Sequence, residues 1–418
     1  MKCKLKFSTV IVFTYVIAIL FDYRLFYLGN ISGLLSQNEI CTITSILGIV
    51  LCFICYQRYR HYNVKLFNCA LKISSLILLY WGAIVLYSVV NYPKQPVIYS
   101  VVQHISILYF VWTIPLLSFL YSSKGYKGLF ETINVIVFIW YILLVIQYFY
   151  WLKTGNLIFN NILFSNVRTR TYGIRIGLGS LGNIMILYNF NKLVNMSRDL
   201  LIKIWYFIQF ALGLFCLIFI QQTRAFSAIV FLSMAIIVFS GAKKISKKII
   251  LYSFLFIVIA YIIYTGILYD FFVSFKIDES NREFLGTSLR IDAIQYYLEC
   301  FRKSIIFGNG FTSDKYYPLV QYKFSGSFNL LFYSDVGIFG LLGETGIGVV
   351  FFYIIPLLTM IKILIKNKLM KNSFILSLVA YVLLTSFTLI ITDVYRAIAF
   401  PLIFAIFLYE SDKKINNM

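Results

Sequence analysis

The chain has 418 residues, of which 61% are hydrophobic, 19% aromatic and only 13% charged. Soluble domains carry about a quarter charged residues, so this composition excludes a soluble globular protein. The net charge of +21 comes from 37 Lys and Arg against 16 Asp and Glu. In a membrane protein this excess follows from topology and from attraction to anionic lipid, and it implies no nucleic-acid partner.

Hydrophobic runs recur along the whole chain. Each has roughly 17 to 25 residues, enough for a helix to cross the hydrocarbon core of a bilayer. The pattern predicts an all-α polytopic membrane protein, with residues 1–418 forming one membrane domain of about twelve transmembrane helices. The expected spans are 7–23, 40–56, 70–91, 97–121, 129–151, 172–190, 200–221, 224–241, 249–270, 335–361, 373–392 and 395–410.

The basic residues divide between the two sides of the predicted membrane. Lysine-rich ends and loops resist translocation, so both termini are expected in the cytoplasm. Nine of the twelve arginines then lie on the outer side, namely Arg24, Arg168, Arg170, Arg175, Arg224, Arg282, Arg290, Arg302 and Arg396. Retention of so many guanidinium groups on that side calls for a chemical reason.

Two outer loops carry much of this charge. The first, 152–171, runs into NVRTRTYGIRI (166–176), which brings Arg168, Arg170 and Arg175 into the sixth span together. Arg175 is expected about one turn inside that span, where a charge requires a partner or a wet cavity. The second is a large external loop, 271–334, and long ordered loops usually carry function.

The segment SLRIDAIQYYLECFRKSIIFGNGF (288–311) within that loop predicts a helix lying on the membrane, with Ser288 as its cap. Its apolar face is expected to present Leu289, Ala293, Tyr296, Cys300 and Ser304. Arg302 has Glu299 three residues earlier, so a surface ion pair accounts for it. Arg290 has no acid three or four residues away. It suits a phosphate ligand, and interfacial snorkelling is the alternative.

Further candidates stand at the ends of later spans. Arg224 lies where the seventh span turns tightly into the eighth, and Asp393 and Arg396 are spaced for a local ion pair. The tenth span opens SDVGIFGLLGETGIG (334–348), in which Asp335 either caps the helix or accepts a proton or hydrogen bond from a substrate hydroxyl. Glu344 shares a face with three glycines and is therefore expected to face a close helix or a cavity.

The sequence offers little for a metal or cofactor site. The seven cysteines are scattered and are expected to be buried apolar residues. The two histidines are His61, in a cytoplasmic loop, and His104, inside a span. Neither a histidine metal site nor a Ser-His-Asp triad is therefore expected on the outer face.

The order of these motifs resembles a known superfamily. TRAF at the start of a span, then SLRIDAI and IIFGNGF after a long outer loop, then SDVGIFGLLGETGIG leading the next span, is similar to the O-antigen polymerases (Wzy type) and O-antigen ligases. The resemblance covers roughly residues 165–400. It implies a metal-independent glycosyltransferase without a cofactor, which uses polyprenyl-pyrophosphate-linked sugars at the periplasmic face of the cytoplasmic (inner) membrane.

The resemblance also implies roles for residues. Arginines hold the pyrophosphate in the ligases, and they match Arg224 and Arg290 here. The histidine that the ligases place near the start of the following span has no counterpart, because the matching stretch reads YSDVG, with Asp335 nearest. This departure favours a polymerase. The predicted catalytic residues are Asp335, Arg290 and Arg224, the predicted pyrophosphate ligands are Arg168, Arg170, Arg175, Arg224 and Arg290, and the secondary candidates are Glu344 and Arg396.

The expected function is therefore polymerisation of O-antigen or surface polysaccharide repeat units, with a lipid-linked oligosaccharide as both donor and acceptor. Membrane lipids and a chain-length regulator protein are further expected partners. Two alternatives stay open at this point. A ligase would transfer finished polymer to lipid A core, and a transporter or flippase would move the lipid-linked oligosaccharide across the membrane.

Overall fold

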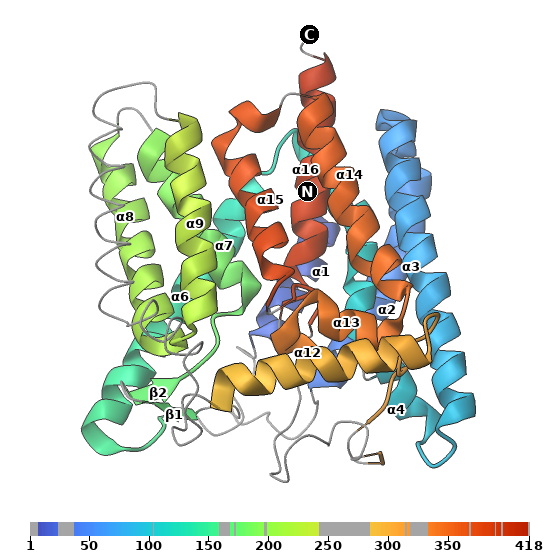
Figure 1. The fold of residues 1–418 in the computed structure, drawn as a ribbon. Coiled ribbons are helices and arrows are strands. Elements are labelled where there is room, and N and C mark those ends of the chain that lie inside the picture. The colour runs from blue at the N-terminus through green and yellow to red at the C-terminus, as the bar shows by residue number, and fades with distance from the viewer. Residues whose placement is uncertain are drawn as a thin grey trace, which may run out of the picture.

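The computed structural model is a bundle of helices with one two-stranded ribbon at one end (Figure 1). Among the residues it describes, five helices are long and apolar enough to cross a membrane, as expected of a membrane protein. The described residues are 7–23, 37–102, 104–158, 168–170, 173–195, 199–241, 285–313, 316–317, 333–367, 369–388, 390–393 and 396–416.

Six of the expected spans correspond to helices that run through the predicted apolar segments. Their sequences hold few charges and no proline, so every turn can keep its backbone hydrogen bonds. They are α1 (Phe7–Asp22), α2 (Gln37–Tyr59), α3 (Val64–Asn91), α6 (Lys127–Thr154), α8 (Leu200–Phe215) with its continuation η4 (Cys216–Gln221), and α9 (Arg224–Gly241). The short turn η2 (Arg60–Tyr62) joins α2 to α3.

The expected span 97–121 is not one continuous helix. It consists of α4 (Val97–Val102), the tighter helix η3 (Ile105–Trp112) and α5 (Thr113–Ser123). Pro115 has no amide hydrogen for the carbonyl group four residues earlier, and its ring crowds that group. The α-helical hydrogen-bond pattern is therefore interrupted before α5, and His104 lies at the break between α4 and η3.

The expected span 335–361 is also broken. Its parts are η6 (Tyr333–Val336), α13 (Ile338–Thr345), η7 (Val350–Ile354) and α14 (Ile355–Lys366). Gly337 and Gly346, at the two ends of α13, have φ angles of 60° and 58°. Glycine adopts this conformation readily because it has no Cβ atom. The prediction of a single helix was wrong because these glycines end α13 after only two turns.

The start of the sixth span differs from the prediction as well. The antiparallel strands β1 (Arg168–Arg170) and β2 (Gly173–Arg175) precede α7, which runs over Gly179–Asn195. Arg175 therefore lies in a strand before the helix, and its expected position one turn inside a span was wrong. The backbone satisfies its hydrogen bonds here through the ribbon and through the Ile176 amide, which donates to the Ile220 carbonyl at 3.0 Å.

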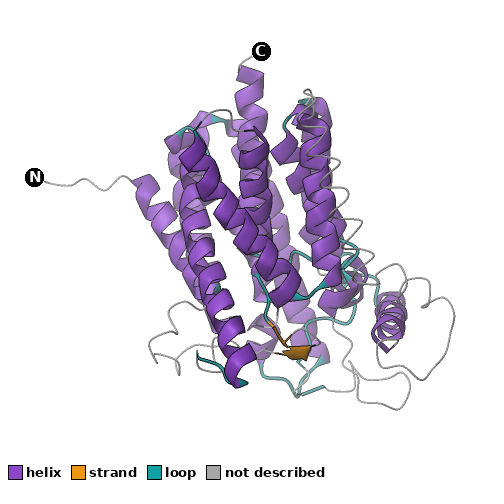
Figure 2. Ribbon diagram, turned by 90° about the vertical axis from the view of Figure 1, so that its left-hand side faces the viewer, coloured by secondary structure: helices purple, strands orange, loops and turns teal. Residues whose placement is uncertain are grey.

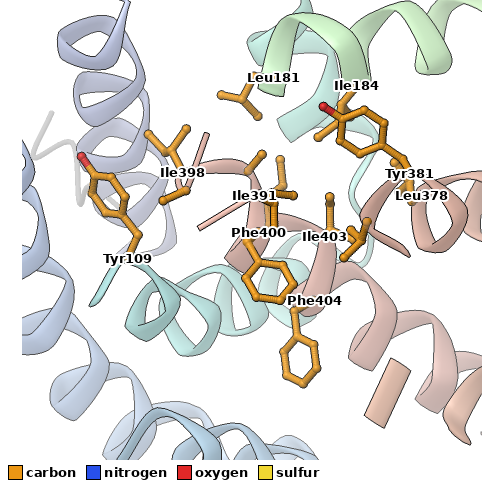
Figure 3. Close-up of a cluster of buried hydrophobic side chains, with 14 of the residues drawn as sticks. Tyr109, Leu181, Ile184, Leu378, Tyr381, Ile391, Ile398, Phe400, Ile403 and Phe404 are labelled. Carbon is orange, nitrogen blue, oxygen red and sulfur yellow. The ribbon is translucent and has the colours of Figure 1, made fainter. Parts of the chain in front are cut away.

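The last helices begin after the short turn η8 (Leu369–Lys371). α15 (Ser373–Thr385) ends earlier than the expected span 373–392, and the chain turns through 390–393 before α16 (Ala399–Asn416). α16 occupies the centre of the bundle, and its apolar side chains are buried on all sides. The cluster in Figure 3 joins α16 to η3, α7 and α15 through Phe400, Ile403, Phe404, Tyr109, Leu181, Ile184, Leu378 and Tyr381.

Helix α12 (Leu285–Lys303) lies across one end of the bundle, roughly perpendicular to the long helices (Figure 1). The ribbon β1–β2 is at the same end, and the C-terminus is at the opposite end (Figure 2). α12 begins before Ser288, so the expectation that this serine caps the helix was wrong. Its buried side chains include Ala293, as expected, and also Tyr297 one turn later. The expected span 249–270 and the parts 271–284, 314–315 and 318–332 of loop 271–334 lie outside the described residues.

Candidate functional site

A buried histidine and a buried glutamate meet where the two broken spans are interrupted. The His104 Nε2 atom lies 3.0 Å from the Glu344 Oε2 atom, with side chains that are 3% and 10% exposed. His104 stands at the beginning of η3, and Glu344 is in the last turn of α13. At this distance the two groups form an ion pair whenever the imidazole is protonated.

Backbone contacts fix the position of Glu344. The Gly310 amide donates to the Glu344 carbonyl at 2.9 Å, and the Asn309 amide donates to the Gly343 carbonyl at 2.7 Å. Gly308 packs so closely that a Cβ atom there would lie 2.4 Å from the Gly343 carbonyl oxygen. The segment after α12 is therefore fitted onto the end of α13, which holds the glutamate in place.

The same segment covers His104. The Phe311 ring lies 4.6 Å from the imidazole, centroid to centroid. Phe311 is held in turn by α3 and the turn that follows it, because its amide donates to the Ser88 hydroxyl at 2.7 Å and its carbonyl accepts from the Gln95 side chain at 3.0 Å. Gln95 is fully engaged, since its Oε1 atom also accepts from the Ser313 amide. The orientation of the imidazole is thus fixed by packing.

Tyr333 connects this pair to a second pair of charges. Its ring lies edge-on to the imidazole at 4.9 Å, and its hydroxyl donates to Asp393 Oδ1 at 3.3 Å. The phenol keeps its proton and donates it in this hydrogen bond to the Asp393 carboxylate.

Asp393 forms the predicted ion pair with Arg396, at 3.0 Å, and this prediction is confirmed. The guanidinium group also donates to the Ile390 carbonyl at 3.2 Å and lies 5.6 Å from the centre of the Phe226 ring. Phe226 is in the first turn of α9, which begins at Arg224. The buried charges thus extend from the broken spans to the start of α9.

The arginine ribbon adjoins the same start of α9. Arg175 Nη2 donates to the Thr223 hydroxyl at 3.0 Å. The register places Arg168 directly opposite Arg175, and Arg170 opposite Gly173. Residues directly opposite share a face, as do residues two apart along a strand. The positions of Arg168, Arg170 and Arg175 therefore lie on one face of the ribbon.

The other predicted residues lie on α9, on the ribbon, on α12 and in η6. Arg224 begins α9 after a turn of two residues, as the sequence predicted. For Arg224, Arg168 and Arg170 the structure describes the backbone. Arg290 is exposed on α12. Asp335 lies in η6, and its backbone carbonyl accepts from the Thr388 hydroxyl at 3.3 Å. The described contacts of Arg290 and Asp335 do not extend to the His104–Glu344 pair.

Glu344 faces protein and not lipid, so the expectation for this residue is confirmed. His104 is the functional candidate that the sequence analysis missed. Its signal was present, because an ionisable residue within an apolar run is costly and by default marks a site. Without knowledge of the break at this point, the histidine was set aside as a residue of an ordinary span.

The chemistry of this region is that of acid–base pairs and guanidinium groups. Among the described residues, no group of three His, Cys, Asp or Glu side chains is arranged to hold a metal ion. Cys300 lies on α12, where burial raises the pKa of its thiol, so the reactive thiolate is disfavoured. Arginines near one another can bind an oxyanion bidentately, and a carboxylate beside an imidazole can accept a proton.

Comparison of the chain with models of known protein families finds no match, and a search of curated proteins finds none either.

Proposed function

We propose that the chain is a membrane-embedded glycosyltransferase that polymerises repeat units of O-antigen or a related surface polysaccharide. Its donor is a polyprenyl-pyrophosphate-linked glycan, and its acceptor is a second lipid-linked repeat unit. In this proposal twelve spans place both termini in the cytoplasm of the cell and the arginine ribbon on the outer side of the inner membrane. The motif order TRAF, SLRIDAI and SDVGIFGLLGETGIG is what points to this family.

The observation that carries the proposal is the register of the arginine ribbon. It puts three arginine positions on one face, and Arg175 contacts the turn that leads into Arg224. Several guanidinium groups gathered from separate segments suit a ligand with two linked phosphates. α12, with the exposed Arg290, lies at the same end of the bundle, where the head group of a lipid-linked donor would be bound (Figure 1).

The mechanism follows from the charge that develops during transfer. As the bond between the sugar and the pyrophosphate breaks, negative charge accumulates on the leaving pyrophosphate. Preorganised arginines stabilise this charge more strongly than that of the bound donor, which lowers the barrier. The attacking sugar hydroxyl needs orientation and a proton acceptor, for which Asp335 and Glu344 are the two candidate carboxylates.

The test replaces Arg175 and Arg224 by alanine, singly and together, in cells that lack the native chain. Loss of one such group costs about 100-fold to 1000-fold in rate, so long-chain polysaccharide should disappear while single repeat units remain on the cell surface. The matched control is Arg58→Ala, an exposed arginine at the end of α2. Gel analysis of polysaccharide length, with immunoblots of membrane fractions, provides the measurement.

Different outcomes of this test separate the alternatives. Normal chain length in both single variants and in the double variant would contradict the proposal. If deletion of the chain leaves no repeat unit on lipid A core, the chain is a ligase, because a polymerase deletion still allows single units to be attached.

A second candidate function is transport of the lipid-linked glycan. It is favoured by the two interrupted spans with an ionisable pair between them, since transporters often place their sites at such breaks. A transporter deletion would leave lipid-linked repeat units at the cytoplasmic face. A polymerase deletion would leave them at the outer face, where an added glycosidase can reach them in intact spheroplasts.

A further inference from the structure

We propose that Glu344 takes the proton of the acceptor sugar hydroxyl and that His104 positions its carboxylate. This inference rests on the proposed function and names the acid–base group of the same reaction. It assigns a catalytic role to Glu344, which the sequence left second to Asp335, and a positioning role to a histidine from a distant part of the chain.

The burial of the pair decides which member meets the substrate. The Glu344 side chain is 10% exposed, whereas that of His104 is 3% exposed and is enclosed by Phe311 and Tyr333. The carboxylate is therefore the more exposed member of the pair and is the one that we assign to the acceptor. A proton acceptor needs hydrogen-bond reach to the hydroxyl and a fixed orientation.

The backbone around Glu344 supplies that fixed orientation. Gly346 ends α13 immediately after Thr345, and its own Cβ position would lie 2.3 Å from the Ile306 carbonyl oxygen. On the other side the Gly310 amide holds the Glu344 carbonyl. Asp335, by comparison, stands in the short helix η6 with a described contact to Thr388 through its backbone only. The structure thus gives Glu344 an ionisable partner and a tightly fitted backbone.

The pair is also linked to the arginines that the proposed function requires. From His104 the contacts continue through the Tyr333 ring to Asp393, and through the ion pair to Arg396. Arg396 lies against Phe226, two residues after Arg224. The proton-accepting pair and the start of α9 are therefore joined by one continuous series of side-chain contacts.

The reaction balances without any further reactant. The acceptor oxygen forms a bond to the anomeric carbon of the donor, and the bond from that carbon to the pyrophosphate oxygen breaks. Its electron pair leaves with the polyprenyl pyrophosphate. The hydroxyl proton passes to the Glu344 carboxylate, and it leaves later to the pyrophosphate product or to water. His104 carries no covalent intermediate in this scheme.

Other titratable and charged groups face the pair and contribute to its pH response. They come from α12, η6 and the turn before α16, and they are Tyr296, Tyr297, Cys300, Tyr333, Asp393 and Arg396. A comparison between variants must therefore change one member of the pair at a time and leave these groups in place.

The experiment uses the full chain in proteoliposomes. The probe is lipid-linked repeat unit extracted from membranes of cells that lack the chain, and the rate of polymer formation is followed from pH 5 to pH 9. Glu344→Gln should lower the rate at least about 100-fold with donor binding retained. Glu344→Asp should restore part of it, and the control Glu131→Gln, a carboxylate on α6 held by the hydroxyls of Tyr188 and Tyr206, should stay within about twofold of the wild type. His104→Gln should lower the rate about tenfold.

The pH profile separates positioning from a purely structural role. The imidazole Nε2–H lies 3.0 Å from Glu344 Oε2, and a hydrogen bond donated there favours the charged carboxylate. The flexible glutamine in His104→Gln does not hold its amide in this fixed position, so the acidic limb of the rate profile should move to higher pH. The inference is overturned if Glu344→Gln keeps more than half of the rate, or if the His104→Gln profile coincides with that of the wild type. If the wild-type chain forms no polymer from this probe, the proposed function fails. If it does and only the arginine variants are inactive, the proton acceptor alone is misassigned.

Discussion

Two of the regions in which the described residues bury polar side chains differ in kind. Where α6, α7 and α8 pack together, the buried groups are neutral amides, which we call the amide layer: Asn134, Asn189 and Gln209. Asn134 and Asn189 each donate to the other's side-chain oxygen at 3.0 Å, and Asn134 also donates to Gln209. These bonds join helices that are themselves unbroken at this level.

At the interrupted spans the buried groups are ionisable. His104, Glu344, Asp393 and Arg396 lie in or beside segments where the helices stop, and of these four only Glu344 lies inside a helix. Neutral amides between apolar helices contribute modest packing stability. Buried charges are costly, and proteins that retain them usually use them. The comparison therefore assigns helix packing to the first region and chemistry to the second.

The largest expected effect on stability comes from adding a side chain where a helix is interrupted. In Gly346→Ala the new Cβ atom would lie 2.3 Å from the Ile306 carbonyl oxygen at a φ of +58°. Strain and the clash should lower the free energy of unfolding by about 3 kcal/mol or more. Thermal unfolding of the purified protein in detergent measures the effect.

The matched control is Gly82→Ala in the interior of α3, where no atom lies within 4 Å of the new Cβ. Alanine suits a helix better than glycine, so stability should stay equal or rise by up to about 1 kcal/mol. Equal losses in the two variants would show that the break at Gly346 is no special requirement of the fold.

The features that the sequence predicted correctly are those that depend on residues near one another in the chain. Unbroken apolar runs predicted α3 and α6, and the spacing of Asp393 and Arg396 predicted their ion pair, which is confirmed. The tight turn before Arg224 was also correct, because few residues separate the two runs. In each case the deciding interaction spans only a few positions, or it follows from the apolar character of one continuous segment.

The features that the sequence did not predict are those that depend on contacts between distant segments. Gly346 lies within an apolar run, and only the approach of the carbonyl groups of Ile305 and Ile306 requires a break there. The contact of His104 with Glu344 requires both breaks at once. Arg175 was predicted to lie in a helix because an apolar run follows it. That run carries no signal of the hydrogen-bonded ribbon in which Arg175 lies. These features depend on tertiary contacts that periodicity does not encode.

An intermediate effect is expected from Asn134→Leu in the amide layer. It leaves Asn189 and Gln209 with unmatched polar atoms in an apolar interior, so the free energy of unfolding should fall by about 1 to 2 kcal/mol. The rate of polymer formation per folded molecule should stay unchanged. Leucine at all three positions removes every unmatched group and should recover most of the lost stability. A lasting loss of activity in the triple variant would contradict a packing role for this layer.

The smallest effect is expected from Glu131→Gln. Its result can be compared directly with that of the same substitution at Glu344. The hydroxyls of Tyr188 and Tyr206 both donate to Glu131 Oε1, at 2.9 Å and 2.5 Å. A glutamine keeps an oxygen at this position, so both hydrogen bonds can remain. The free energy of unfolding should change by less than about 1 kcal/mol, and polymer formation should stay within about twofold of the wild type.

The same isosteric change at Glu344 should lower polymer formation at least about 100-fold under the proposed function, in which this carboxylate accepts the proton. Thermal unfolding and the proteoliposome rate, measured on both variants at one pH, make the comparison. If Glu131→Gln slows the reaction as much as Glu344→Gln does, loss of a carboxylate anywhere in the bundle impairs the protein through its fold. If only Glu344→Gln is slow and both variants unfold near the wild-type temperature, the difference lies in the chemistry at the broken spans.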